Sequence, residues 1–240
     1  MEEKVSGIVL SSINFGENDK ILTIFTLEQG VLSAKIKGVK KAGAKLKFAS
    51  EPFCFAEFIF AKTGKNRTVI NASLIESFYS IREDIIKYYA GAAVLEFVKK
   101  FCMEGIVSTE LFMLAIDCLK KITYDNYPCS VLVDFLIQAL RLTGYALNLN
   151  GCFDCQCSFS ISNPQRIYFD YVFGGFFCEK CKKDGAREIN LSTFHSLSRI
   201  YKGELLEKEE CVGALRLLDF YLQAKPEEKI NSLKQLLNII

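Results

Sequence analysis

Residues 20–38 read KILTIFTLEQGVLSAKIKG, and this stretch decides the fold of the first part of the chain. It holds two runs rich in β-branched and aromatic residues, 20–27 and 31–38, separated by the turn sequence Glu28-Gln29-Gly30. Apolar and polar residues alternate in the second run: Leu32, Ala34 and Ile36 against Ser33, Lys35 and Lys37. This alternation predicts a strand whose solvent face carries lysines.

Three more strand-like runs lie around this pair, at residues 5–13, 53–62 and 67–75. Turn residues bound them, as in Gly16-Glu17-Asn18-Asp19 and Thr63-Gly64-Lys65-Asn66. Five short strands at such close spacing are typical of a small closed barrel. We therefore predict a barrel domain at residues 1–79.

A helical period replaces the strand pattern after residue 75. Ser80-Ile81-Arg82-Glu83 matches a capping box, which predicts that the first helix begins there. Later helices are predicted at residues 109–122, 128–142, 192–201, 209–222 and 227–240. Residues 149–190 are instead rich in Cys, Gly and aromatic residues, as in a segment that a metal holds together. The chain is thus predicted to be α+β, with an all-α domain at 80–240 that carries a four-cysteine zinc ribbon or finger at residues 149–190.

The composition restricts the function classes. Half of the 240 residues are hydrophobic and the net charge is +2, so any nucleic-acid site must be local. No apolar run approaches the ~20 residues of a membrane span, and the start lacks a secretory signal, so we expect a cytoplasmic protein.

Phosphate-loop, H-E-x-x-H and G-x-S-x-G motifs are missing, and the single histidine, His195, lies in a predicted helix. No enzyme activity is expected.

Four of the ten cysteines form two C-x-x-C motifs, Cys152/Cys155 and Cys178/Cys181, with 22 residues between them. Because disulfides are rare in the cytoplasm, this spacing predicts a four-thiolate zinc site that is closed to water and therefore structural. Cys157 leaves an alternative open, since it either replaces Cys155 as a ligand or lies beside the site. Buried packing without metal is the other alternative. The remaining cysteines have apolar neighbours and are predicted to be core: Cys54, Cys102, Cys118, Cys129 and Cys211.

A run of lysines without acidic residues begins in the third predicted strand: Lys35, Lys37, Lys40, Lys41, Lys45 and Lys47. Lysines at this density suit contact with successive phosphates of a nucleic acid, which needs charge but reads no sequence. A solvated loop is the alternative. Lys62, Lys65 and Arg67 would extend the basic surface if the fold places them on the same side.

The order of these motifs resembles the RecO family of bacterial recombination mediators. The matching segments, in chain order, are Gly7-Ile8-Val9-Leu10, Gly16-Glu17-Asn18-Asp19, Lys37-Gly38-Val39-Lys40-Lys41, Glu51-Pro52-Phe53, Thr143-Gly144-Tyr145, Tyr168-Phe169-Asp170 and Gly174-Gly175, the last three around the cysteine pairs. The resemblance implies an OB-fold barrel that binds single- and double-stranded DNA through the basic loop and anneals complementary strands. It also implies structural Zn²⁺ and partnership with RecR and single-stranded DNA-binding protein during RecA loading.

One departure from the family concerns the basic loop, which is usually richer in Arg and here has only Lys around Ala42-Gly43-Ala44. Lys lacks the bidentate fork of Arg, so weaker and more salt-sensitive DNA binding is expected.

Phe15, Phe25 and Phe48 are candidates for base stacking, depending on which is exposed. Two rival hypotheses are a zinc-ribbon adaptor that binds only protein and a hydrolase that uses Cys157 beside the metal.

Overall fold

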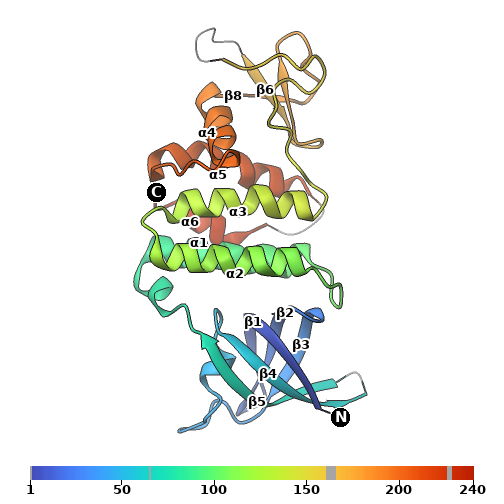
Figure 1. Cartoon of the computed structure of the whole chain (residues 1–240), viewed down its shortest axis with the longest axis vertical. Helices are drawn as coiled ribbons and strands as arrows, with labels where there is room; N and C mark the ends of the chain where they lie inside the picture. Colours follow the sequence, from blue (N-terminus) through green and yellow to red (C-terminus); the bar gives the residue numbers. More distant parts are fainter. Residues whose placement is uncertain (1, 65, 161–165, 226–228) are drawn as a thin grey trace.

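The computed structural model describes residues 2–64, 66–160, 166–225 and 229–240, and Figure 1 shows a barrel, a group of helices and a small sheet. The barrel strands are β1 (Glu2–Phe15), β2 (Asp19–Thr26), β3 (Gly30–Ile36), β4 (Phe55–Thr63) and β5 (Asn66–Glu76). They close in the order β1-β2-β3-β5-β4, and only the β3–β5 pair is parallel. The predicted five-stranded, OB-like barrel is confirmed.

The barrel interior follows the alternation seen in the sequence. Leu32, Ala34 and Ile36 are at most 2% exposed, whereas Ser33 between them is exposed. The other strands contribute large apolar side chains to the same core: Val5, Val9, Leu22, Ile24, Phe58 and Phe60. Because the inward positions are filled by apolar residues, the outward positions of β3 are left for polar and charged side chains.

The predicted helical domain is confirmed. Its helices are α1 (Ile85–Phe101), α2 (Thr109–Tyr124), α3 (Pro128–Leu142), α4 (Leu191–Tyr201), α5 (Lys208–Gln223) and α6 (Asn231–Leu237). His195 lies within α4. Residues 227 and 228 of the last predicted helix lie outside the described residues. Among the described helices, none is long and apolar enough to cross a membrane.

The first helix begins later than the capping-box pattern at Ser80 predicted. Residues Tyr79–Glu83 form a short 3-10 helix, η2, and α1 starts after Asp84. The Asp84 carboxylate accepts hydrogen bonds from the backbone nitrogens of Ile86 at 2.8 Å and Lys87 at 2.9 Å. Asp84 thus satisfies two amide groups that have no partner within the helix and places a negative charge at its positive end.

The cysteine-rich segment, which the sequence predicted to be a zinc ribbon or finger, contains a small sheet whose individual strands no local pattern located. Its strands are β6 (Ile167–Asp170), β7 (Gly175–Cys178) and β8 (Arg187–Ile189), in the order β7-β6-β8. Every residue of β6 and β7 is buried. Figure 1 shows this sheet at the end of the molecule opposite the barrel, with the helices between them.

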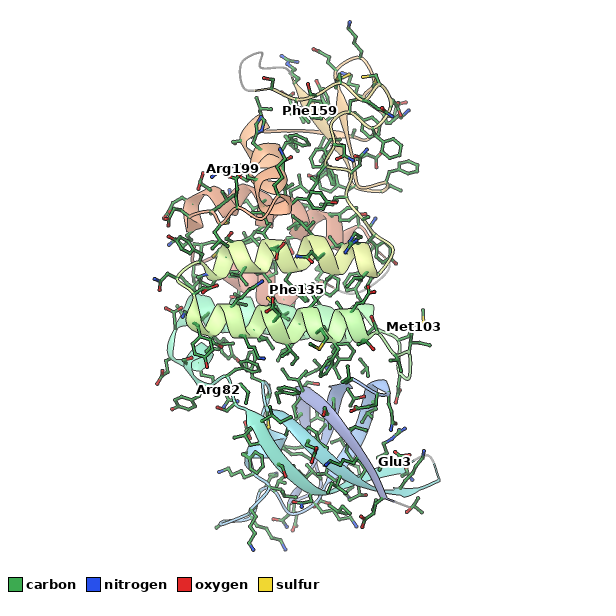
Figure 2. All side chains as sticks on the ribbon, viewed as in Figure 1. Glu3, Arg82, Met103, Phe135, Phe159 and Arg199 are labelled. Atoms are coloured by element: carbon green, nitrogen blue, oxygen red, sulfur yellow. The ribbon has the colours of Figure 1, made fainter. Side chains whose placement is uncertain are left out.

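Several apolar residues of the barrel, among them Ile8 and Phe25, belong to the core of the helices, whereas the barrel interior forms a cluster of its own. The ring of Phe112 on α2 lies 5.3 Å from that of Phe25 and 6.0 Å from that of Phe55, measured between centroids. Gly30, with φ of 67°, allows a close approach, because a Cβ there would lie 2.1 Å from the carbonyl oxygen of Ile106. The core continues between the helices, where Figure 2 shows Phe135. The barrel is therefore packed onto the helices rather than loosely tethered to them.

Candidate metal centre and nucleic-acid interface

Cysteines from two loops meet beside the small sheet. In the first loop the chain turns back at Gln156, whose φ is 58°, and its nitrogen donates to the Cys152 carbonyl oxygen at 2.9 Å. In the second loop the nitrogen of Cys181 donates to the Cys178 carbonyl oxygen at 3.1 Å. Cys178 ends β7, and its N–H donates to the Sγ of Cys152 at 3.4 Å. This contact joins the two loops.

Four sulfur atoms lie close enough together to hold a metal ion. The Sγ atoms of Cys152, Cys155, Cys157 and Cys178 are all within 4.8 Å of one another, and those of Cys155 and Cys178 are 3.7 Å apart. A tetrahedral zinc site with Zn–S bonds of about 2.3 Å requires sulfur atoms about 3.8 Å apart. Soft thiolates favour zinc over calcium or magnesium. The spacing and the donor atoms both fit such a site.

Cys181 also contacts this group. Side-chain hydrogen bonds with Cys155 and Cys178 raise the pKa of the Cys181 thiol to about 12. Hydrogen bonds from the backbone and thiol of Cys157 lower the pKa of Cys155 to about 6, which favours the thiolate that metals bind. The close group of four therefore contains Cys157 in place of the predicted Cys181, which contacts the group through Cys155 and Cys178.

The other five cysteines are not part of a reactive site. Burial raises the pKa of Cys54 and Cys211 to about 12 and that of Cys102 and Cys129 to about 11. Cys118 is fully buried, and its pKa is also well above the usual value. Thiols with such raised pKa values are poor nucleophiles. The predicted core role is confirmed for Cys54, Cys118, Cys129 and Cys211, which are buried, while Cys102 is only partly buried against the core.

The lysine run starts on β3 and continues into the loop that leads to the short helix η1 (Phe48–Ser50). This loop, residues 37–47, projects from the end of the barrel that faces away from the helices (Figure 1). Two contacts fix its start: the Gly38 nitrogen donates to Oδ1 of Asp19 at 2.9 Å, and the Lys40 nitrogen donates to the Asn18 carbonyl oxygen at 3.1 Å. The loop is thereby anchored beside the β1–β2 turn.

The six lysines differ in their partners. Lys35 lies 2.8 Å from Oδ2 of Asp19, and the hydrogen bond between them holds the pKa of Asp19 below its ordinary value. The other five lysines are exposed, and none has an ion pair with a carboxylate in the described parts of the chain: Lys37, Lys40, Lys41, Lys45 and Lys47. Their charges are therefore free to attract an anion.

The neighbouring cations contribute less to this surface. Lys62 lies 2.8 Å and Arg67 3.5 Å from the carboxylate of Glu3, which compensates both charges. Arg67 nevertheless lines the same groove as Lys35, whereas Lys65 lies outside the described residues. The sequence alone could not predict this pairing, because Glu3 is on β1, Lys62 on β4 and Arg67 on β5, and only the closed barrel brings the three together.

Two family models match consecutive parts of the chain. The model described as recombination protein O N terminal matches residues 1–78, which contain the barrel. The model described as recombination protein O C terminal matches residues 82–234, which contain the helices and the cysteine cluster. The chain belongs to the RecO family.

Curated relatives that carry the name DNA repair protein RecO align with most of the chain. The RecO of Caldicellulosiruptor saccharolyticus is 31% identical over 194 residues, which cover 81% of this chain and 78% of the relative. That of Bacillus subtilis is 29% identical over 234 residues, 93% of this chain and 89% of the relative. That of Exiguobacterium sibiricum is 28% identical and covers 100% of this chain and 99% of the relative. The protein is thus a DNA repair protein of the RecO family.

Proposed function

We propose that this RecO family member is a recombination mediator that binds single- and double-stranded DNA without sequence specificity and anneals complementary strands. In this role it assists RecA loading together with RecR and single-stranded DNA-binding protein, acts at the nucleoid in the cytoplasm, and catalyses no chemical step. The observation that carries the DNA-binding step is the exposed loop at residues 37–47, whose five lysines have no carboxylate partner among the described residues.

The proposed DNA contacts are Lys35, Lys37, Lys40, Lys41, Lys45 and Lys47. A lysine ammonium group neutralises a phosphate as a point charge and releases a condensed counterion, with no contact to a base edge. Annealing requires the same property, because lowering the repulsion between two backbones leaves their bases free to pair. Binding therefore depends on salt: for each phosphate contacted, a tenfold rise in salt concentration lowers the logarithm of the affinity by about 0.7–0.9.

The cysteine cluster is proposed to hold a structural Zn²⁺ through Cys152, Cys155, Cys178 and Cys181, with Cys157 close enough to replace one of them. Four thiolates leave no open position for water, so the ion would link the two loops rather than activate a substrate. The 3.7 Å distance between the sulfurs of Cys155 and Cys178 supports this proposal. A hydrolase that uses Cys157 is not supported, since burial raises the pKa of this thiol to about 12.

Charge reversal in the loop tests the DNA-binding proposal. The variant Lys37→Glu/Lys40→Glu/Lys41→Glu/Lys45→Glu should lose salt-dependent binding to labelled single- and double-stranded DNA in fluorescence anisotropy, because four attractive charges become repulsive. The matched control Lys99→Glu/Lys120→Glu/Lys202→Glu/Lys234→Glu makes the same change of net charge at exposed lysines of the helical part. Equal losses in the two variants would mean that net charge matters and the loop does not.

A protein-binding adaptor is the second candidate function. The turn between β6 and β7 exposes Val172 by 73% and Phe173 by 67%, and Phe153 in the nearby cysteine loop is 51% exposed. Exposed apolar groups of this size favour contact with a partner. If the wild-type protein shows no affinity for either form of DNA at low salt, the adaptor becomes the better explanation.

A further inference from the structure

The outer surface of the barrel contains a groove next to the lysine loop. It is lined by Phe15, Ile21, Ser33, Ala34, Lys35, Lys37, Asn66, Arg67, Thr68 and Glu104. The strand registers bring Ile13 opposite Ile21 and Ile21 opposite Lys35, so these outward positions of β1, β2 and β3 form one continuous surface. The groove is thus built on rigid strands, while the loop lies at its edge.

Phe15 is the aromatic residue of this groove. Phe25 is fully buried in the core, which excludes it, and Phe48 lies beyond the loop on η1. Phe15 is 48% exposed and Ile13, two residues earlier on the same strand, is 61% exposed. The ammonium group of Lys35 lies 4.4 Å from the centroid of the Phe15 ring. This cation–π contact orients the ring while about half of the residue remains open to solvent.

The charges of the groove differ from those of the loop. Lys35 is paired with Asp19 and Arg67 with Glu3, and the negative charge of Glu104 offsets that of Lys37, the one positive charge of the lining without an ion pair among the described residues. A phosphate would gain little in such a compensated groove, whereas an uncharged, flat base loses nothing from the nearby carboxylates. The unpaired lysines of the loop attract the phosphate backbone, and the groove beside Phe15 then receives the bases that this backbone carries.

We infer that Phe15 is a stacking platform for an unpaired base and makes this protein prefer single-stranded over double-stranded DNA. The inference rests on the proposed DNA-binding function and adds to it a residue that distinguishes the two forms. In a duplex the faces of the bases are covered by their neighbours, so the Phe15 ring has no base to stack on. Single strands offer both charge and open base faces.

The test compares two labelled oligomers of about 16 nucleotides, near the largest site of one OB fold. One is oligothymidine, and the other has the same phosphates but abasic sugars. Phe15→Ala should weaken oligothymidine binding by about tenfold, since stacking contributes about 1–3 kcal/mol per base. Its affinity for the abasic oligomer and for duplex DNA should match that of the wild type. Phe15→Tyr, which keeps the ring, should restore oligothymidine binding.

Controls separate this inference from the proposed function. Phe220→Ala removes a ring on α5 with a similar exposure of 51% and should leave every affinity unchanged. Circular dichroism melting checks that each variant is folded. If Phe15→Ala binds oligothymidine as the wild type does while the lysine-loop variant does not bind, the stacking inference is wrong and the DNA-binding proposal stands. If the wild type binds none of the three DNA ligands, both are wrong.

Discussion

Cys157 changes what the two cysteine motifs can do, because it brings a fifth thiol to a site that needs four. Its sulfur belongs to the group of four within 4.8 Å, and Cys181 is hydrogen-bonded to Cys155 and Cys178 in the same cluster. Motif spacing could not exclude either residue, since Cys157 is close in sequence to Cys155 and Cys181 is close to Cys178. Whether Cys157 or Cys181 is the fourth ligand therefore depends on the position of a single side chain.

Substitution of these cysteines tests the site at this scale. Cys157→Ser and Cys181→Ser should each retain bound zinc, because the other thiol completes the tetrahedron. The double variant should lose zinc and melt at a lower temperature, as should the wild type after chelation. Atomic emission gives the zinc content, and the visible absorption of the Co²⁺ form reports the number of thiolate ligands.

Cys102→Ser is the matched control, because Cys102 is a partly buried cysteine outside the cluster. Its zinc content should be that of the wild type. Loss of zinc from Cys181→Ser alone would show that Cys157 cannot substitute, and an unchanged melt after verified metal removal would contradict a structural role.

At the level of elements, the start of α1 depends on which side chain reaches the free amide groups of the first turn. The sequence around Ser80 has the spelling of a capping box, but these residues form a 3-10 helix. Asp84 instead accepts from two backbone nitrogens and caps α1. The η2 helix links the last barrel strand to α1, so this cap lies where the chain passes from one part of the molecule to the other.

Removal of the Asp84 carboxylate should destabilise the protein. Asp84→Ala is expected to lower the free energy of unfolding by about 1 kcal/mol, since two amide groups at the helix start lose their acceptor. Ser80→Ala, the control at the position that the sequence pattern favoured, should change it by less than about 0.5 kcal/mol. Urea unfolding followed by far-ultraviolet circular dichroism measures both. A larger effect at Ser80 than at Asp84 would contradict the structure.

For the whole molecule, the important feature is the apolar junction through which residues of the barrel join the core of the helices. Phe25 and Phe55 of the barrel both pack edge-on against Phe112 of α2. Gly30 adds a backbone contact at the same junction. The helices thus connect the barrel to the small sheet at the opposite end of the molecule (Figure 1).

Loss of the Phe112 ring should destabilise the barrel and the helical part together. Phe112→Ala should lower the free energy of unfolding by about 3–5 kcal/mol, because a buried ring is replaced by a cavity. Hydrogen exchange should accelerate in β2 as well as in α2, which mass spectrometry of the two segments measures. Phe220→Ala on the exposed face of α5 should have little effect. Faster exchange confined to the helices would mean that the barrel is stable without this contact.

The sequence by itself determined those features that depend on local pattern. Alternation in residues 31–38 predicted β3, and the helical period predicted the later helices. The spacing of Cys152/Cys155 and Cys178/Cys181 predicted a cluster of thiols, of which Cys152, Cys155 and Cys178 lie in the close group of four. Hydrophobic burial and turn chemistry act over a few residues, so they can be recognised without the fold.

The tertiary structure alone decided the features that join distant segments. It paired Lys35 with Asp19 and Arg67 with Glu3, left the loop lysines unpaired in the described residues, and buried Phe25 while exposing Phe15. It also formed the β6–β8 sheet and brought Cys157 beside Cys178. Such contacts depend on strand register and on which distant segments the fold brings side by side, and short stretches of sequence do not encode either.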